Sequence, residues 1–178
     1  MKFSIRNTLD KDISLYQICF DDTEFHYFLF GDNNKDIHKF VSIDDNYLKY
    51  IISRENNHRQ EDIAFVHFCY NPASQEYWFS GGIIPHLFNS GLGIYVAVAI
   101  ISYFFKYNQN ATVKAGTYKY NQRSLRMLQS LGFKILEYKN KEIILKLTFS
   151  YFNNEFVNKI LKRIEINDNK ITNNLEYL

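Results

Sequence analysis

Glycine, proline and cysteine are all scarce in this sequence. Of the 178 residues, 7 are glycine, 2 are proline and 2 are cysteine. Cys19 and Cys69 lie far apart in the chain, each between apolar neighbours, so we expect two buried, reduced thiols and no metal site. Lysine, asparagine and isoleucine are abundant instead, which is typical of an AT-rich bacterial genome.

The sequence also lacks an apolar run long enough to cross a membrane. Its longest apolar stretch, residues 94–105, ends at Lys106, whereas a membrane-spanning helix needs about 20 residues. We therefore expect a core helix there and no membrane partner. The opening segment MKFSIRNTLDKD lacks the apolar centre of a signal peptide, which favours a cytoplasmic protein.

No basic stripe of the kind that binds nucleic acids is visible. The chain has 21 basic and 19 acidic residues, and its nearest approach to a cluster is Lys159, Lys162 and Arg163. We expect these three to form a solvated helix face, and we expect no nucleic-acid partner. The apolar content of 46% and charged content of 22% indicate one globular domain over residues 1–178.

Hydrophobic periodicity gives the order of the elements. Short apolar or alternating runs predict strands over residues 2–7, 62–70, 76–84, 111–120, 134–139 and 142–149. Helical spacing predicts helices over residues 9–20, 42–54, 94–105, 121–133 and 151–164. Residues 21–42, which include EFHYFLF, are ambiguous between a strand and an aromatic-rich loop. The polar segment NDNKITNN at the C-terminus is expected to be frayed.

Three of these elements carry more detailed expectations. Ser42 is a candidate cap for the helix over residues 42–54, and Gly132 should end the helix over residues 121–133 in a left-handed conformation. The last helix should be a C-terminal extension that directs four apolar side chains toward the body of the protein: Phe152, Phe156, Ile160 and Ile164.

Together the elements predict an α/β (α+β) fold with a mostly antiparallel sheet flanked by helices. Residues 76–120 form a strand–helix–strand crossover, the place where ligands collect in such folds.

A glycine-containing loop, FNSGLG (88–93), lies inside this crossover and leads into the apolar helix. Gly91 and Gly93 permit a close approach to the backbone, and the first-turn amides of the helix favour an anion such as a pyrophosphate. A plain tight turn explains such glycines about as often. The loop does not match a Walker P-loop, since no Gly-Lys-Ser/Thr follows, or a Rossmann turn, since Val96 occupies the place of the third glycine.

The surroundings of this loop resemble motif A of the GNAT superfamily of acyl-CoA N-acyltransferases. A strand ends at Pro85, and Gly91 and Gly93 then occupy the glycine positions of the motif, but Phe88 stands where Arg or Gln is usual. Further along, NQRSLRMLQSLGF (121–133) resembles motif B of the same family. The two motifs occur in the expected order, with the expected strand between them.

The resemblance implies a GNAT-like fold in which two splayed strands form a slot for acetyl-CoA, the acyl donor. The adjacent glycines Gly81 and Gly82 in the strand before the loop suit a bulge or a close backbone approach, as such a slot would need. The residues that the resemblance places at the cofactor are Gly82, Ile83, Ile84, Phe88, Asn89, Ser90, Gly91, Leu92, Gly93, Ile94, Asn121, Ser124 and Leu128. Asn121 is equally suited to cap its own helix.

The same resemblance implies an amine that attacks a thioester, which requires proton transfers. Glu76 is the first candidate base, with His86 and His67 as alternatives, although each also has an ordinary structural explanation. The tyrosine that often protonates the departing thiolate in this family is replaced by Leu128. Ser124 is then the candidate acid, unless its hydroxyl only bonds its own helix.

The acceptor is less well defined by the sequence. Trp78 and Tyr118 are candidate substrate contacts, and we favour a small-molecule amine or an amino sugar as the acceptor. Three alternatives stay open: a protein N-terminus as acceptor, a longer acyl-CoA or acyl carrier protein as donor, and a CoA-binding module without catalytic activity. Homodimerisation through the C-terminal helix stays open as well.

Overall fold

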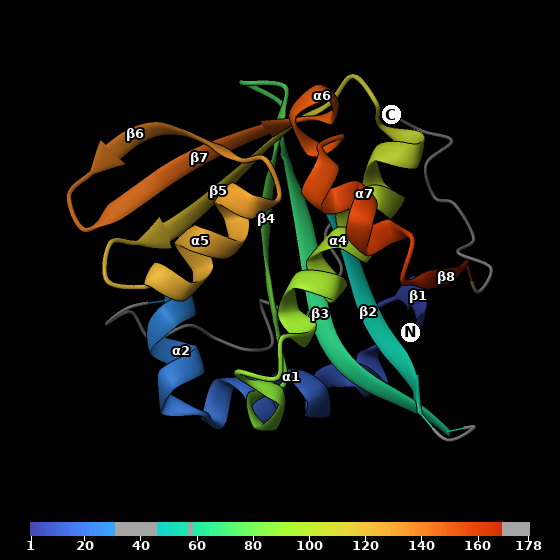
Figure 1. Cartoon of the computed structure of the whole chain (residues 1–178). Helices are drawn as coiled ribbons and strands as arrows, with labels where there is room; N and C mark the ends of the chain where they lie inside the picture. Colours follow the sequence, from blue (N-terminus) through green and yellow to red (C-terminus); the bar gives the residue numbers. More distant parts are fainter. Residues whose placement is uncertain (31–45, 57–58, 169–178) are drawn as a thin grey trace.

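A mixed sheet of eight strands runs through the computed structural model, which describes residues 1–30, 46–56 and 59–168 (Figure 1). The strands are β1 (Lys2–Asn7), β2 (Tyr47–Asn56), β3 (Arg59–Asn71), β4 (Glu76–Ile83), β5 (Thr112–Tyr118), β6 (Lys134–Lys139), β7 (Glu142–Thr148) and β8 (Glu165–Asp168). Their order across the sheet is β6-β7-β5-β4-β3-β2-β1-β8. Only β4–β5 and β1–β8 pair in parallel among these described strands, so the prediction of a mostly antiparallel sheet is confirmed.

Helices cover both faces of this sheet. They are α1 (Ile13–Asp21), α2 (Thr23–Phe30), α4 (Leu92–Tyr107), α5 (Gln122–Ser130), α6 (Phe149–Phe152) and α7 (Glu155–Leu161), with short 3-10 turns at Asp10–Asp12 and Pro85–Leu87. Helix α4 contains the apolar run of residues 94–105 and is buried on nearly all sides. None of the described helices combines the length and apolar character needed to cross a bilayer.

Stacked aromatic rings join the helices to the central strands. Phe104 of α4 stacks on Phe68 of β3 with ring centroids 4.2 Å apart. From the opposite face Tyr16 of α1 stacks on Phe65 of β3, at 4.4 Å. The middle of this strand is therefore covered on both faces, and this explains why residues 63–70 of β3 are almost all apolar.

The helix predicted over residues 42–54 is wrong, because the chain forms strand β2 there. The spacing of Tyr47 and Ile51 suggested one helical face, but Tyr50, Ile51 and Ile52 are all buried. In a strand, consecutive burial means that both faces of the sheet are covered here, so the apolar residues of β2 do not follow the spacing of a single helical face. Ser42 and Ile43, the expected cap and first contact, lie outside the described residues.

The segment EFHYFLF is neither of the two structures that its sequence suggested, because it lies in helix α2. Asp22 begins this helix by accepting a hydrogen bond from the Phe25 amide at 2.8 Å, as an N-cap residue does. Of its aromatic side chains, Phe25 packs into the core beside Phe65.

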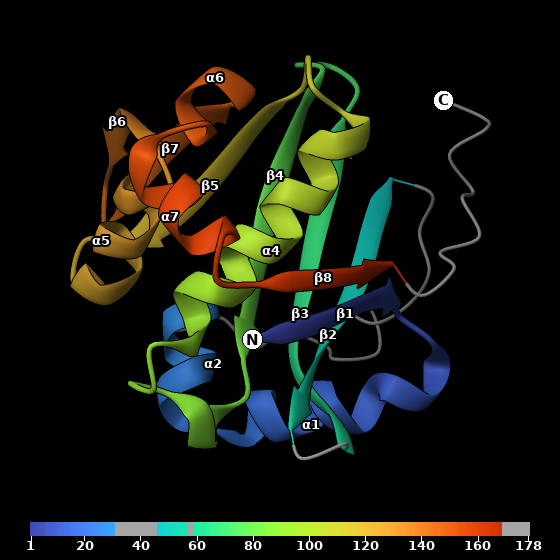
Figure 2. The same ribbon diagram turned by 45° about the vertical axis from the view of Figure 1, so that its right-hand side comes forward.

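The single C-terminal helix predicted over residues 151–164 is also wrong. Helix α6 ends before Asn153, and Asn154 then caps α7 by accepting a hydrogen bond from the Val157 amide at 3.0 Å. This new start rotates the helix, so that Val157 is buried and Phe156 is 42% exposed. Strand β8 follows and lies alongside β1 (Figure 2). Asn167 and Asp168, the first two residues of the segment expected to fray, belong to this strand, and the segment's other residues, 169–174, lie outside the described residues.

The end of helix α5 is as predicted. Gly132 has φ +99°, and the Phe133 amide donates to the Leu128 carbonyl at 3.1 Å. Phe133 is buried, so this left-handed turn both ends the helix and adds to the core.

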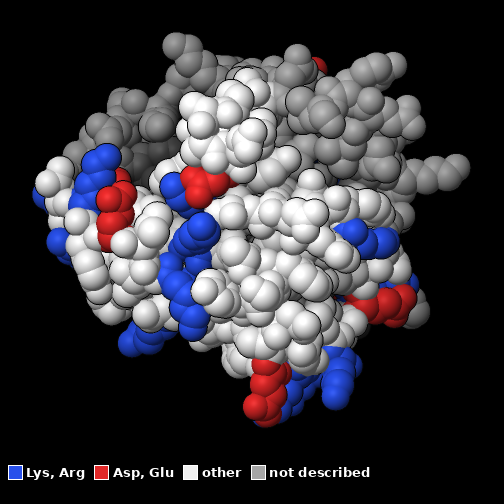
Figure 3. Space-filling model, turned by 90° about the horizontal axis from the view of Figure 1, so that it is seen from above, with Lys and Arg blue, Asp and Glu red and all other residues white. Residues whose placement is uncertain are grey.

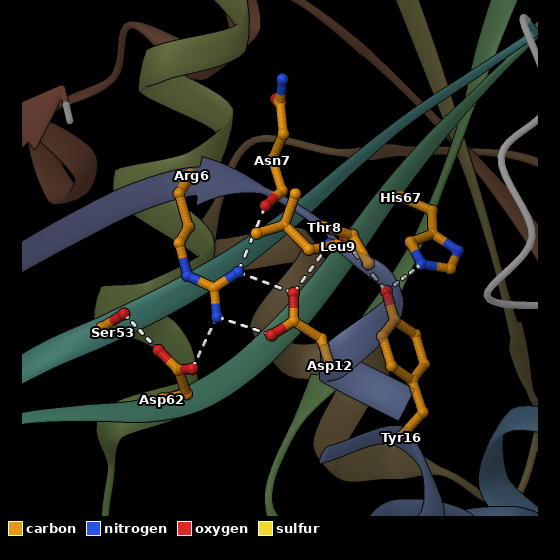
Figure 4. Close-up of polar contacts among 9 residues, drawn as sticks. All are labelled: Arg6, Asn7, Thr8, Leu9, Asp12, Tyr16, Ser53, Asp62 and His67. Atoms are coloured by element: carbon orange, nitrogen blue, oxygen red, sulfur yellow. Dashed lines mark hydrogen bonds and ion pairs between the residues drawn. The ribbon is translucent and has the colours of Figure 1, made fainter. Parts of the chain in front are cut away.

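A polar network ties the first strand and the turn after it to β3 (Figure 4). The Arg6 guanidinium donates to both carboxylate oxygens of Asp12, at 2.6 and 2.8 Å, and to Asp62 at 2.6 Å. Burial alone would raise the pKa of the Asp12 carboxyl, but the hydrogen bonds from Arg6 and the Leu9 amide outweigh it and lower this pKa. The network therefore holds Asp12 as a carboxylate inside the fold.

A neutral histidine lies beside this network. His67 of β3 is buried, and its Nε2 lies 2.8 Å from the Tyr16 hydroxyl, to which it is hydrogen-bonded (Figure 4). Burial, with a smaller effect from Lys49, lowers the pKa of His67 to about 3. The ring is uncharged at neutral pH and contributes to packing.

Charged side chains are interspersed on the face seen from above (Figure 3). Blue and red groups alternate along the edge of a broad uncharged area, and no basic stripe crosses the described part of this face.

The low pKa of His67 predicts that the protein loses stability as the pH falls from 7 to 5. The unfolded chain binds a proton near pH 6.5, whereas folded His67 binds one only near pH 3, so protons favour the unfolded state between these values. The expected loss from His67 by pH 5 is about 2 kcal/mol in the free energy of unfolding. A His67→Gln variant keeps a partner for Tyr16 and should lose this much less between the two pH values.

Urea unfolding of both proteins at pH 7 and pH 5 measures the difference, since the other histidines contribute equally to each. Identical losses in the two proteins would contradict a neutral, buried His67.

Candidate active site

Strands β4 and β5 pair over only two residues and then diverge (Figure 1). The pairs are Tyr77 with Val113 and Trp78 with Lys114. Beyond Trp78, the backbone groups of β4 that face β5 therefore have no ladder partner in the described sheet. The splayed strands expected from the sequence are present.

A cavity of about 440 Å³ occupies the gap between the two strands. It extends from the diverging strands to the loop before α4 and the first turns of α5. Ten of the residues that the resemblance placed at a cofactor line it: Gly82, Ile83, Phe88, Asn89, Gly91, Gly93, Ile94, Asn121, Ser124 and Leu128. Two motifs that are well separated in the sequence thus meet around one cavity.

The other three expected cofactor residues do not line this cavity. Ile84 is buried, and its amide donates to the Ile63 carbonyl at 2.9 Å. The Ser90 hydroxyl donates to the Leu87 carbonyl at 2.6 Å and accepts from the Leu92 amide at 3.2 Å. Ser90 and Leu92 therefore shape the loop from within.

The glycine loop presents an open backbone at the start of α4. Gly91 precedes the helix with φ +79°, a conformation that favours glycine, and a Cβ there would meet no atom within 4 Å. At Gly93 the nearest atoms to a Cβ are Ile83 Cδ1 and Met127 Sδ, both at 3.9 Å. The positive end of the long α4 dipole thus faces uncluttered space on the cavity side, an arrangement that suits an anion.

The two adjacent glycines of β4 serve close packing and do not form a bulge. The pairing of β4 with β3 continues in register through Gly81 and Gly82. A Cβ at Gly81 would overlap with the Phe65 carbonyl, and a Cβ at Gly82 would overlap with the Phe25 ring. Gly82 therefore lets α2 close one side of the cavity.

Asn121 and Ser124 lie at the first turn of α5. The Asn121 side chain accepts a hydrogen bond from the Ser124 amide at 3.0 Å, so Asn121 does cap the helix, as its sequence position allowed. Both residues also line the cavity.

Glu76 does not reach the cavity. Its carboxylate forms an ion pair with Lys114 Nζ at 2.6 Å, and this hydrogen bond lowers the pKa of Glu76. A carboxylate that is already stabilised by a lysine is a weak base, and it lies where β4 and β5 still pair.

The alternative bases are placed elsewhere too. His86 is exposed, with its Nε2 3.7 Å from Glu61, and His67 is buried beside Tyr16.

The candidate substrate contacts are also outside the cavity lining. Trp78 lies beneath Lys114, and Tyr118 stacks on Tyr120 with centroids 5.2 Å apart.

The lining also contains residues that the sequence did not assign to the cofactor, among them Phe25, Thr117 and Arg123. Thr117 is 5% exposed, and its Oγ1 has no hydrogen-bond partner within the described structure. The alternation of β5, in which Val113 and Ala115 also point inward, could have shown that residue 117 faces the interior. Phe25 could not have been found, because α2 itself was not predicted.

The described residues contain no group of three or more His, Cys, Asp or Glu side chains arranged to hold a metal ion. The lining residues in the described part offer hydroxyls, amides and one guanidinium instead. These groups suit an organic ligand that carries phosphate and amide groups.

The Gly81 geometry predicts a specific sensitivity of β4. Gly81→Ala should lower the free energy of unfolding by more than about 1 kcal/mol, because φ is +151° and the new methyl group would overlap with the backbone of β3. Gly116→Ala on β5 is the matched control, since its methyl group would meet only ordinary contacts, the nearest at 3.6 Å. Urea unfolding measures both, and equal effects would show that Gly81 is not required by the close approach of β3.

No protein-family model and no curated protein matches the sequence. Solved structures do match the fold. Spermidine N-acetyltransferase from Vibrio cholerae, in complex with CoA and spermine, is similar with a TM-score of 0.71 and 12% identity over 85% of this chain and 98% of that chain. AAC(6')-Ib in complex with paromomycin and acetyl-CoA is similar with a TM-score of 0.71 and 12% identity, over 87% of this chain and 98% of that one.

The ribosomal-protein-S18-alanine N-acetyltransferase from Escherichia coli is similar with a TM-score of 0.61 and 18% identity, over 82% of this chain and 92% of that one. At these identities the likeness concerns the fold. Together with the splayed β4 and β5 and the two motifs around their cavity, it confirms the resemblance at that level: the chain has the fold of the GNAT N-acetyltransferases.

Proposed function

We propose that this protein is an N-acetyltransferase that moves an acetyl group from acetyl-CoA to a primary amine. The observation that carries the proposal is the cavity between β4 and β5, which ends at the glycine loop and the start of α4. Similar folds include N-acetyltransferases solved with CoA and spermine and with acetyl-CoA and paromomycin, which supports an amine as the acceptor here. A small-molecule amine or an amino sugar is the acceptor that we favour.

The lining residues fit the chemical groups of acetyl-CoA. The open backbone at Gly91 and Gly93 suits the diphosphate. The unpaired edge of β4 offers amides and carbonyls to the pantetheine arm, which itself contains two amides. Thr117 adds a buried hydroxyl that lacks a partner in the described structure. Buried polar groups without partners are uncommon, so this hydroxyl is best explained by a ligand that pairs with it.

Acetyl-CoA supplies the acetyl group as a thioester, whose carbonyl carbon an amine attacks. The protein residues hold the reactants and exclude water, because the inner wall is made of Val66, Phe79, Ala97 and Leu128. We propose that β4 amides near the diverging point stabilise the oxyanion, an effect worth about 2.7–4 kcal/mol where one such donor has been removed from other enzymes.

Ser124 remains our candidate to protonate the departing thiolate, because it lines the cavity and Leu128 offers no hydroxyl. Glu76 is not assigned as the base, since it is paired with Lys114 away from the lining. We infer instead that Glu76 and Lys114 hold the two strands together at the closed end of the gap.

A CoA-binding module without catalysis is the second candidate. The observation that favours it is the lining itself: among the described residues it contains neither a carboxylate nor a histidine. The two candidates share the donor site and differ only in turnover, so one pair of assays separates them.

Acetyl-CoA should raise the melting temperature of the protein, because it binds the folded chain alone. At a concentration 100 times its Kd the expected stabilisation is about 2.7 kcal/mol. Thiol release from acetyl-CoA, measured with polyamines, amino sugars, aminoglycosides and peptide N-termini, then identifies the acceptor. Stabilisation without thiol release for any amine would favour the module, and no stabilisation at millimolar acetyl-CoA would overturn both candidates.

Thr117→Val should have opposite effects on stability and on binding. Valine has nearly the shape of threonine, so the free protein should gain about 1 kcal/mol by losing an unpaired buried hydroxyl. Acetyl-CoA should bind several-fold more weakly, because the same hydroxyl is its partner. Thr112→Val, on the same strand but outside the cavity lining, is the control. Calorimetric titration and urea unfolding measure the two effects, and unchanged binding would remove Thr117 from the site.

A further inference from the structure

The glycine loop lacks a charged side chain at the position where one is expected. Phe88 stands where the family motif has Arg or Gln, so the loop offers an anion only backbone amides and the neutral Asn89 side chain. A diphosphate carries two negative charges at neutral pH. Some other part of the chain must supply a cation if the ligand is to be neutralised by the protein.

Arg123 lies next to this loop, although it comes from a different helix. Its guanidinium carbon is 4.8 Å from the centroid of the Phe88 ring, over which it lies. Its Nη1 donates to Asn89 Oδ1 at 3.1 Å, across 34 residues of sequence. The ring of Phe88 therefore forms a platform that holds the guanidinium beside the loop, an arrangement favoured by the attraction between a cation and an aromatic face.

The platform is itself fixed by the core. Phe88 stacks on Phe25, with ring planes 10° apart and centroids at 6.1 Å. Phe25 is buried and also contacts Phe65 of β3. The order from β3 outward is thus Phe65, Phe25, Phe88 and then Arg123, so the position of the guanidinium is set by a series of packed rings.

Arg123 is the one charged residue among the described residues that line the cavity. Its acidic contact is Glu24, with Nη2 3.6 Å from the carboxylate, and the Glu24 side chain is 56% exposed. A pair this long and this exposed contributes little. A guanidinium binds a phosphate through two parallel hydrogen bonds, which is a stronger interaction than the long, exposed pair with Glu24.

We propose that Arg123 binds the diphosphate of the acyl donor and provides the cationic side chain that the loop lacks at Phe88. The inference rests on the proposed function, because it concerns the same donor site, and it adds a residue and a charge that neither motif assigns. The backbone of residues 91–94 would hold the diphosphate from the side of α4, and Arg123 would hold it from the side of α5.

The test compares Arg123→Gln and Arg123→Lys with the wild type in calorimetric titrations with CoA. Arg123→Gln should raise the Kd about tenfold at low salt, and Arg123→Lys should raise it less, because lysine keeps the charge but loses the paired geometry. Arg126→Gln is the matched control, since Arg126 is exposed on the same helix one turn later and does not line the cavity. Its Kd should equal that of the wild type.

Two further readouts separate phosphate binding from a merely structural role. The Kd of the wild type should increase with sodium chloride concentration, and that of Arg123→Gln should increase less, because one charge–charge contact has been removed. The loss in Arg123→Gln should be the same for CoA and for 3′-dephospho-CoA, because both carry the diphosphate. The melting temperature of the free variant should equal that of the wild type.

The outcomes are distinct. If the wild type does not bind CoA, the proposed function fails. If the wild type binds CoA but Arg123→Gln binds it equally well, with the same salt dependence, the inference about Arg123 is overturned while the proposed function stands. If the loss disappears with 3′-dephospho-CoA, Arg123 binds the 3′-phosphate, and the assignment to the diphosphate is overturned.

Discussion

The short pairing of β4 with β5 creates the cavity and determines where the neighbouring loop and helices meet. The two strands share two residue pairs and then separate, whereas each of their other neighbours pairs over a longer stretch. The ion pair between Glu76 and Lys114 lies at the closed end, where pairing persists. At the open end the sheet exposes backbone edges to a cavity, and the helices that follow each strand begin there. A sheet paired along its full length would leave no room for a ligand.

Stability and ligand binding make opposite demands at this opening. Thr117 is buried without a partner in the described structure, and Gly81 and Gly82 bring β3 and α2 against β4 with no side chain between them. The unpaired hydroxyl weakens the free protein, because a buried polar group without a partner is unfavourable, whereas the two glycines are required by the close approach of β3 and α2. We expect an unpaired buried hydroxyl at the wall of a cavity when that cavity binds a ligand, and a simple packing defect does not explain it.

The sequence predicted the parts of the fold whose signals are local. The hairpins, the apolar helix and the left-handed turn at Gly132 all depend on periodicity or on turn residues, and the structure has them where they were expected. The predictions for the segments that form strand β2 and helix α2 were wrong, because their structure depends on contacts with distant parts of the chain. Tyr50, Ile51 and Ile52 are buried together only because helices cover both faces of the sheet, and α2 depends on one capping aspartate in an aromatic segment.

The residues of the site also fall into two groups, those that the sequence predicted and those that only the structure shows. The motifs led to the glycine loop and to Asn121 and Ser124, because those residues follow each other at fixed spacing. Arg123 and Phe25 could not be assigned in this way, since their contact with the loop depends on how α5 and α2 pack beside Phe88. Glu76 was favoured from its place at the start of a strand, and only the structure shows its pairing with Lys114.

A titration of the isotope-labelled protein with acetyl-CoA, followed by the backbone amide signals in NMR spectra, shows whether acetyl-CoA binds in the cavity between β4 and β5. We expect the largest shifts at residues 79–83 of β4, residues 88–94 of the loop and α4, and residues 121–124 of α5, in one saturable process. Saturable shifts that leave these three segments unchanged and gather elsewhere would contradict binding in this cavity.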